Sequence, residues 1–173
     1  MSSREVAEKP PDHLFRSMSN ANRLIRAWLV TAITDGLFSS ILVSVFYGST
    51  VMRLWQGVAS VLLGKDALEG GTSTALVGIL MHFSVAFTWS AVFLFLWLRS
   101  TSIRNTVASA SGVIKVAALY GPFIWMVMSF IVIPSFTHRP PTINYRWWVQ
   151  LIGHIPFVAI PIVASIARPR PAP

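Results

Sequence analysis

The chain has 173 residues, of which 54% are hydrophobic and only 12% are charged. A soluble domain usually carries about a quarter charged residues, so this chain has too little polar surface to cover a globule in water. The absence of cysteine excludes disulfides, thiolate metal sites and thiol nucleophiles. The net charge is +8, but the basic residues flank apolar runs and do not form a separate stripe of the kind that binds nucleic acid.

Residues 1–26 are predicted to form a polar cytoplasmic tail. Its last part has amphipathic character, because Leu14, Phe15, Met18 and Ile25 recur at helical spacing. The apolar run that follows starts too late, and is too long, for a cleavable signal peptide. We predict the first membrane span at residues 27–47, which rises about 31 Å as a helix.

A shorter amphipathic helix is predicted at residues 51–63. One helical face carries apolar side chains, and the other carries Arg53, Gln56, Ser60 and Gly64. This pattern is typical of a helix that lies in the membrane interface, or of a shallow re-entrant turn. The linker that follows contains Asp66 and Glu69, which are three residues apart.

Three more spans are predicted at residues 74–98, 113–133 and 147–166. Pro134 is expected to end the third span, and Pro122, Pro156 and Pro161 are expected to kink their helices and free carbonyl groups one turn back. Residues 100–110 and 135–146 read as polar loops, and residues 168–173 as a second cytoplasmic tail. The domain is thus an all-α, four-transmembrane-helix bundle spanning residues 27–167.

The orientation follows from the distribution of lysine and arginine. Ten of them lie in the two tails and near the loop between the second and third spans, whereas four lie on the other side: Arg53, Lys65, Arg139 and Arg146. Because cytoplasmic loops carry the excess of positive charge, both termini are predicted to be cytoplasmic. Tyr145, Trp147 and Trp148 form the aromatic belt expected at the outer surface.

Three ionisable side chains lie inside predicted spans: Asp35, His82 and His154. Such groups are costly in a membrane and are therefore candidates for function. Their depths, counted along the helices, predict that Asp35 and His82 meet near the midplane and that His154 lies at a depth similar to that of His82.

Three hypotheses fit this polar trio. In the first, each side chain satisfies its hydrogen bonds locally or across a helix interface, Asp35 with Thr31 and Thr34 one turn away. Alternatively, Asp35 and His82 relay protons or bind a solute. In the third hypothesis, His82 and His154 are axial ligands of a haem or chlorophyll-type pigment, for which Gly78 leaves room beside His82.

Other features point to packing rather than to chemistry. Asp66 and Glu69 could bind a cation, but a solvent-exposed linker beside Lys65 explains them as well, and no metal site is predicted. No phosphate-binding loop, nucleophile motif or metal-ligand motif is present. Small residues recur four apart, which favours close helix packing. These pairs are Ser40 and Ser44, Ser84 and Thr88, Ala86 and Ser90, and Ala117 and Gly121.

Several short motifs carry a family resemblance: Gly57-Val-Ala-Ser-Val-Leu-Leu-Gly-Lys65, Glu69-Gly70-Gly71, Leu80-Met81-His82-Phe83, Tyr120-Gly121, Val132-Ile133-Pro134, His154, Phe157-Val158 and Pro161-Ile162. Over residues 27–168 the chain resembles a family of uncharacterised four-helix bacterial inner-membrane proteins of about this length. The resemblance implies the architecture and a bacterial source, but it implies no activity.

The sequence therefore predicts a non-enzymatic membrane protein, first of all a structural or accessory subunit of a larger membrane assembly. Its partners would be the lipid bilayer and other membrane subunits or further copies of itself, and not nucleic acid. The first alternative is a small-solute or proton-coupled carrier that uses Asp35 and His82. The second is a subunit that binds haem or a chlorophyll-type pigment through His82 and His154.

Overall fold

The computed structural model describes residues 19–167, and it is almost entirely helical. Of these residues, 88% lie in helices and none lies in a strand. The predicted all-helical fold is confirmed for this part of the chain. The predictions for the two tails fall, for residues 1–18 and 168–173, outside the described residues.

Four helical segments are long and apolar enough to cross a membrane. The first consists of α1 (Asn20–Ile41) and the π-helical turn η2 (Leu42–Phe46), and the second is α3 (Gly71–Arg99). The third joins α5 (Ala110–Val127), η4 (Met128–Val132) and α6 (Ile133–Thr137), and the fourth joins α7 (Tyr145–His154), η5 (Ile155–Ala159) and α8 (Ile160–Ala167). Each predicted span overlaps one of them.

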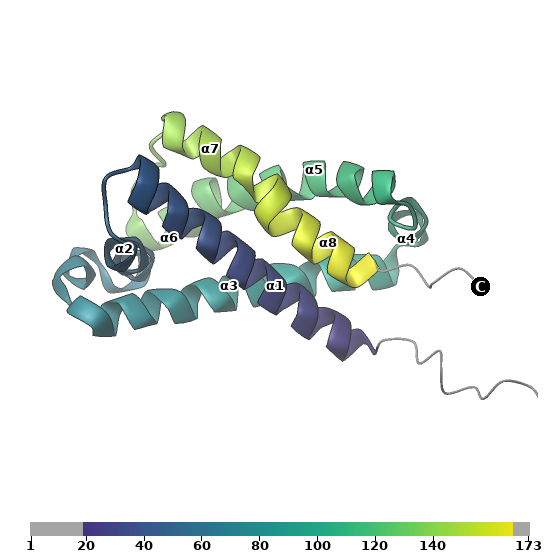
Figure 1. Cartoon of the computed structure of the whole chain (residues 1–173), viewed down its shortest axis with the longest axis horizontal. Helices are drawn as coiled ribbons and strands as arrows, with labels where there is room; N and C mark the ends of the chain where they lie inside the picture. Colours follow the sequence, from purple (N-terminus) through teal and green to yellow (C-terminus); the bar gives the residue numbers. More distant parts are fainter. Residues whose placement is uncertain (1–18, 168–173) are drawn as a thin grey trace, which may run out of the picture.

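Two short helices run crosswise at opposite ends of the long ones. Figure 1 looks almost along the axes of α2 (Val51–Leu63) and α4 (Thr101–Thr106), whereas the long helices lie across the page. A 3-10 turn, η3 (Lys65–Glu69), links α2 to α3. The helix α4 lies within the segment 100–110, which was predicted to be a loop. The Ser100 hydroxyl caps the start of this helix by accepting from the Ile103 N–H at 3.2 Å.

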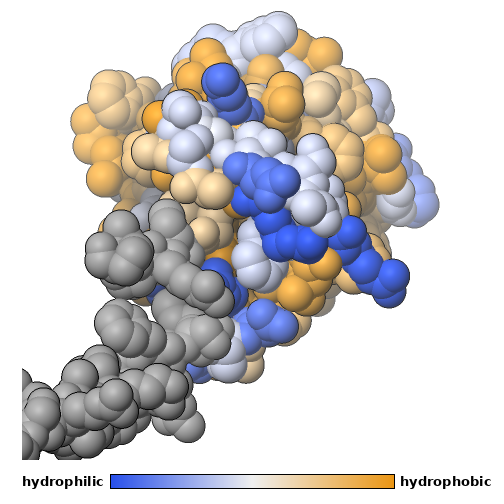
Figure 2. All heavy atoms as spheres, turned by 90° about the vertical axis from the view of Figure 1, so that its right-hand side faces the viewer, coloured by the Kyte–Doolittle hydropathy of each residue, from blue (hydrophilic) through white to orange (hydrophobic). Residues whose placement is uncertain are grey.

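The start of α1 and the end of α8 both lie at the α4 end of the molecule (Figure 1). Figure 2 looks onto this end, where hydrophilic residues gather at the centre of the face and hydrophobic residues cover much of the rim. Large apolar side chains such as Ile33, Leu37 and Leu119 are exposed along the long helices. An apolar flank with a polar end is the distribution that a bilayer requires.

The prediction that Pro134 ends the third helix is wrong. The helix continues to Thr137, and the wide π-helical turn η4 directly precedes the proline-containing turn. A proline removes one N–H and crowds the carbonyl four residues earlier, and a π turn absorbs that misfit. Pro161 follows η5 in the same way, and the carbonyl of Phe157, to which it cannot donate, accepts from the Thr34 hydroxyl of α1 at 2.7 Å.

Most of the buried apolar side chains lie toward the α4 end. The main cluster of buried apolar side chains joins the start of α1, the end of α3, α5 and α8, and its largest fully buried members are Phe93, Ile124, Ile162 and Ile166. The Tyr120 hydroxyl ties α5 to α3 by donating to the Trp89 carbonyl at 2.7 Å. We call this region, from the α4 end to Tyr120, the packed half.

Toward α2, two pairs of helices cross very closely. A Cβ atom added at Gly78 would overlap the Trp55 carbonyl, so α2 crosses α3 backbone to backbone there. A Cβ atom at Gly121 would lie 2.7 Å from the His154 carbonyl oxygen, which marks the crossing of α5 and α7. Only glycine permits such approaches. The region from these crossings to the α2 end is called the hollow half below.

The faces of α2 differ from their prediction at Gln56. This side chain was expected on the water-facing side, but it is 5% exposed and donates to the Gly71 carbonyl at 3.1 Å. The cause is tertiary, because the Gly78 crossing fixes which side of α2 meets α3.

Candidate functional site

A cavity of about 820 Å³ occupies the hollow half. Side chains from α1, α2, α3, the α5–α6 segment and α7 all contribute to its wall. Most of them are apolar, among them Leu54, Val58, Met81, Val85 and Met128. A mainly apolar cavity of this size with a few polar groups is typical of a small-molecule site.

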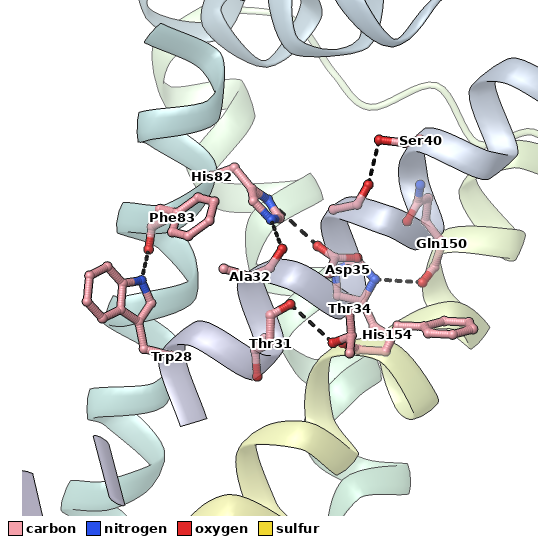
Figure 3. Close-up of polar contacts among 12 residues, drawn as sticks. Trp28, Thr31, Ala32, Thr34, Asp35, Ser40, His82, Phe83, Gln150 and His154 are labelled. Atoms are coloured by element: carbon pink, nitrogen blue, oxygen red, sulfur yellow. Dashed lines mark hydrogen bonds and ion pairs between the residues drawn. The ribbon is translucent and has the colours of Figure 1, made fainter. Parts of the chain in front are cut away.

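All three members of the predicted polar trio line this cavity. Asp35 projects from α1, His82 from α3 and His154 from the end of α7, and Figure 3 shows the aspartate between the two histidines. The structure thus brings together residues that are 47 and 119 positions apart from Asp35 in the chain.

The contact between Asp35 and His82 leaves room for a proton. Their Oδ2 and Nδ1 atoms are 3.8 Å apart, which is beyond a normal hydrogen bond, and the two side chains are 17% and 14% exposed. The other ring nitrogen of His82, Nε2, lies 2.9 Å from the Ala32 carbonyl oxygen, which can only accept (Figure 3). Nε2 therefore carries hydrogen, so in the neutral ring Nδ1 presents a lone pair to the carboxylate.

A proton is needed to turn this contact into an attraction. With His82 neutral and Asp35 ionised, two acceptors face each other and neither can donate. One added proton, on either atom, supplies a donor between them. The geometry of the pair therefore suits a single proton held between the two side chains.

His154 is held differently. Its Nδ1 donates to the Gln150 carbonyl at 2.7 Å within the same helix, and its ring lies 5.0 Å from that of Trp125, measured between centroids. The residue as a whole is 8% exposed. Nε2 is left as the acceptor of the neutral ring.

Three buried polar atoms of the cavity wall have no hydrogen-bond partner within the described residues: the Thr31 hydroxyl, Asp35 Oδ1 and Trp125 Nε1. The local bond from Asp35 to Thr31 or Thr34 is thus not formed, since Thr34 donates to carbonyls instead. A buried polar group without a hydrogen-bond partner costs about 1–3 kcal/mol. The cavity wall therefore carries polar atoms that the protein itself leaves without hydrogen bonds.

Two tryptophans of the cavity wall were not recognised as site residues from sequence. The Trp55 ring packs on His82 with centroids 5.2 Å apart, and the Trp125 ring packs on His154. Trp55 belongs to the apolar face that the sequence predicts for residues 51–63, and Trp125 is one apolar residue among many in its span. No local signal separates such residues from membrane anchors, because only packing decides which way they face.

A second, smaller pocket of about 420 Å³ adjoins the cavity. It shares Trp125, Ile133 and Gln150 with the cavity wall and is otherwise lined by the segment 137–147 and Ser129. Its charged residues are Arg139 and Arg146, and no carboxylate lines it. The Arg146 guanidinium lies 4.4 Å from the centre of the Tyr47 ring.

The predicted acidic pair lies outside both pockets. Asp66 is exposed on η3, whereas Glu69 pairs with Arg53 at 3.3 Å between Oε1 and Nη1. Among residues 19–167 no three His, Cys, Asp or Glu side chains are grouped so that they could hold a metal ion.

Compared with known proteins, the chain matches no protein family, no curated protein and no solved structure. The resemblance to four-helix bacterial inner-membrane proteins therefore stays a prediction.

Proposed function

We propose that the four long helices form a transmembrane bundle in a bacterial inner membrane, with both termini in the cytoplasm. The apolar flank of the long helices supports the embedding, and the lysine and arginine distribution supports the direction. Arg23, Arg99 and Arg104 then belong to the cytoplasmic end, and α2 and the Arg139–Arg146 pocket to the outer end.

Within this bundle we propose a proton-coupled carrier of small solutes. The observation that carries the proposal is the cavity itself: Asp35 and His82 meet on its wall, beside polar atoms that have no partner in the protein. Ionisable groups with unfilled hydrogen-bonding positions, gathered in a mainly apolar cavity, are typical of a binding site.

The chain's own groups suffice for coupling. A proton between His82 Nδ1 and Asp35 Oδ2 neutralises the carboxylate, and a bound solute that contacts the same carboxylate competes with that proton. Binding on one side of the membrane and protonation on the other would then drive exchange of the two. The kinked α7–α8 and α5–α6 segments supply helices that can rearrange around the site.

The test uses the full chain in lipid vesicles that enclose a pH-sensitive dye. Small cationic, neutral and anionic solutes are added outside, and the dye reports proton movement. At least one class is expected to move protons through the wild-type protein and to do so much less through Asp35→Asn or His82→Ala. Absence of proton movement for all three classes would overturn the carrier proposal.

A structural or accessory subunit is the second candidate. Ser84 and Thr88 form an exposed pair of small residues on α3, with both hydroxyls turned to carbonyls of their own helix, at 2.8 and 2.9 Å. Such a face suits contact with another membrane helix. Recovery of the protein in mild detergent as a single species, free of partners, would count against this role.

The pigment hypothesis has less support than these two. The space beside Gly78 is filled by the Trp55 backbone, and His82 Nε2 is engaged with the Ala32 carbonyl. An absorbance spectrum of the purified protein tests it directly, since a haem or chlorophyll-type pigment absorbs visible light.

A further inference from the structure

We propose that the cavity binds a lipophilic organic cation, that is, a largely apolar molecule with one positive charge. This inference rests on the proposed function, because it names the class of solute that the Asp35 cavity takes.

The charge of the cavity wall is the first argument. Asp35 is the single carboxylate among the lining residues, and no lysine lines the cavity. Arg53, on the rim, is already engaged by the Leu68 carbonyl at 2.7 Å and by Glu69. The groups that face Asp35 are thus His82 from α3 and His154 from α7, while the α5–α6 segment contributes no titratable side chain to the wall.

The unpaired oxygen of Asp35 gives the second argument. With both histidines neutral, the carboxylate is one uncompensated negative charge in an apolar setting, and its Oδ1 atom is buried without a partner. A buried charge is strongly disfavoured unless it is paired. A ligand cation removes that cost, whereas an anion would add to it.

The aromatic rings give the third argument. Trp55 and Trp125 line the cavity from α2 and α5, each beside one histidine of the trio. Indole faces attract cations, most strongly where water is excluded. Together with the apolar side chains of the wall, they suit a cation with a bulky hydrocarbon body rather than a small hydrated ion.

The route to the site is the fourth argument. The cavity rim includes Leu62, Leu80 and Phe136, which are 53%, 68% and 55% exposed on the apolar flank, so the cavity opens toward the lipid. The neighbouring pocket carries Arg139 and Arg146, which repel cations. A solute that enters from the bilayer must itself be lipophilic.

Binding and protonation then compete at Asp35. At a pH where the His82–Asp35 pair holds its proton, the carboxylate is neutralised and the cation binds weakly. When the cation binds at such a pH, the pair releases its proton to the buffer. At a pH where the pair has already lost that proton, binding of the cation releases none. The affinity should therefore rise with pH over the range in which the pair titrates.

The experiment is calorimetric titration of the detergent-purified protein with tetraphenylphosphonium and with tetraphenylborate, which have the same shape and opposite charge. Empty micelles provide the blank for each probe. We expect saturable binding of the cation only, and at least tenfold weaker binding to Asp35→Asn. Asp66→Asn, which removes an exposed acid outside the cavity, is the matched control and should bind like wild type.

Comparison of two buffers with different ionisation enthalpies measures the proton released by the wild-type protein, and therefore does not depend on the folding of any variant. No saturable cation binding, equal binding of the borate anion, or no proton release at any pH of a series would overturn the proposal. If an anionic or neutral solute nevertheless moves protons in the vesicle assay, the carrier function stands and only the solute class is wrong. If the cation binds but no protons cross the membrane, the site stands and the carrier function fails.

Discussion

Near α4 the long helices meet side chain to side chain, whereas near α2 they stand apart around a cavity. In the packed half, polar groups have partners: the Tyr120 hydroxyl donates to Trp89, and the Arg23 guanidinium donates to the Ile166 carbonyl. In the hollow half, Thr31, Asp35 and Trp125 each have a buried atom without one. Ser90 is the exception in the packed half.

This difference separates two tasks within one small bundle. Dense packing holds the helices together, since lipid gives little hydrophobic drive for their association and dispersion contacts must supply it. The hollow half gives up such contacts and keeps polar groups that its own side chains do not satisfy. Three of the five buried polar atoms without a partner among residues 19–167 lie on this one cavity wall. Such a concentration of unfavourable groups is expected of a binding site.

The largest loss of stability is expected at the crossing of α2 and α3 in the hollow half. Gly78→Leu places a side chain where the Trp55 backbone now lies, so α2 must move off α3. We expect a loss of at least about 3 kcal/mol or no folded protein at all, because the obstacle is backbone and cannot yield. The measurement is thermal unfolding in detergent, followed by size-exclusion chromatography.

The control is Gly57→Ala on α2 itself, where no atom lies within 4 Å of the added Cβ. It should unfold at or slightly above the wild-type temperature, since alanine favours a helix more than glycine does. Equal damage by the two substitutions would show that α2 does not depend on the Gly78 crossing.

Truncation of an apolar side chain should cost more stability in the packed half than in the hollow half. Phe93→Ala removes a fully buried ring from the packed half and should cost about 3 kcal/mol, the lower end of the range for such changes, because lipid replaces water as the reference. Val58→Ala removes two methyl groups that already border the cavity and should cost less than about 1 kcal/mol. Thermal unfolding of both variants measures the difference, and equal losses would contradict the division into halves.

Loss of a single hydroxyl gives a smaller contrast. Tyr120→Phe removes the donor to the Trp89 carbonyl and should cost about 1 kcal/mol. Thr31→Val keeps the shape of a side chain whose hydroxyl has no partner, so it should be neutral or stabilising. If Thr31→Val were as harmful as Tyr120→Phe in the same unfolding measurement, the Thr31 hydroxyl would have a partner that this account lacks.

The smallest effect is expected at the α2 end of the molecule. Glu69→Gln breaks the ion pair with Arg53, but the two side chains are 83% and 48% exposed, so the change should lower stability by less than about 0.5 kcal/mol. Raising the salt concentration should reduce even that difference. A larger loss in the unfolding measurement would assign this pair a structural role that its exposure does not suggest.

Much of the architecture could be predicted from local patterns. The length and hydropathy of the runs predict the four long helices, and counting residues along them predicts that Asp35 and His82 lie at one depth. Pro134 shows the limit of such rules, because a proline ends a helix only if the preceding turn cannot widen. The π turn at Met128–Val132 has no signature in the residues themselves.

The sequence by itself thus determined that the chain is helical, which segments are apolar and which ionisable residues they contain, since these properties depend on single residues and their spacing. Only the tertiary structure decided the rotation of α2, the burial of Gln56, the position of Trp55 and Trp125 on a cavity wall and the separation of a packed from a hollow half. Those features depend on two backbone crossings, at Gly78 and Gly121, and a glycine in a sequence does not say which helix will pass over it.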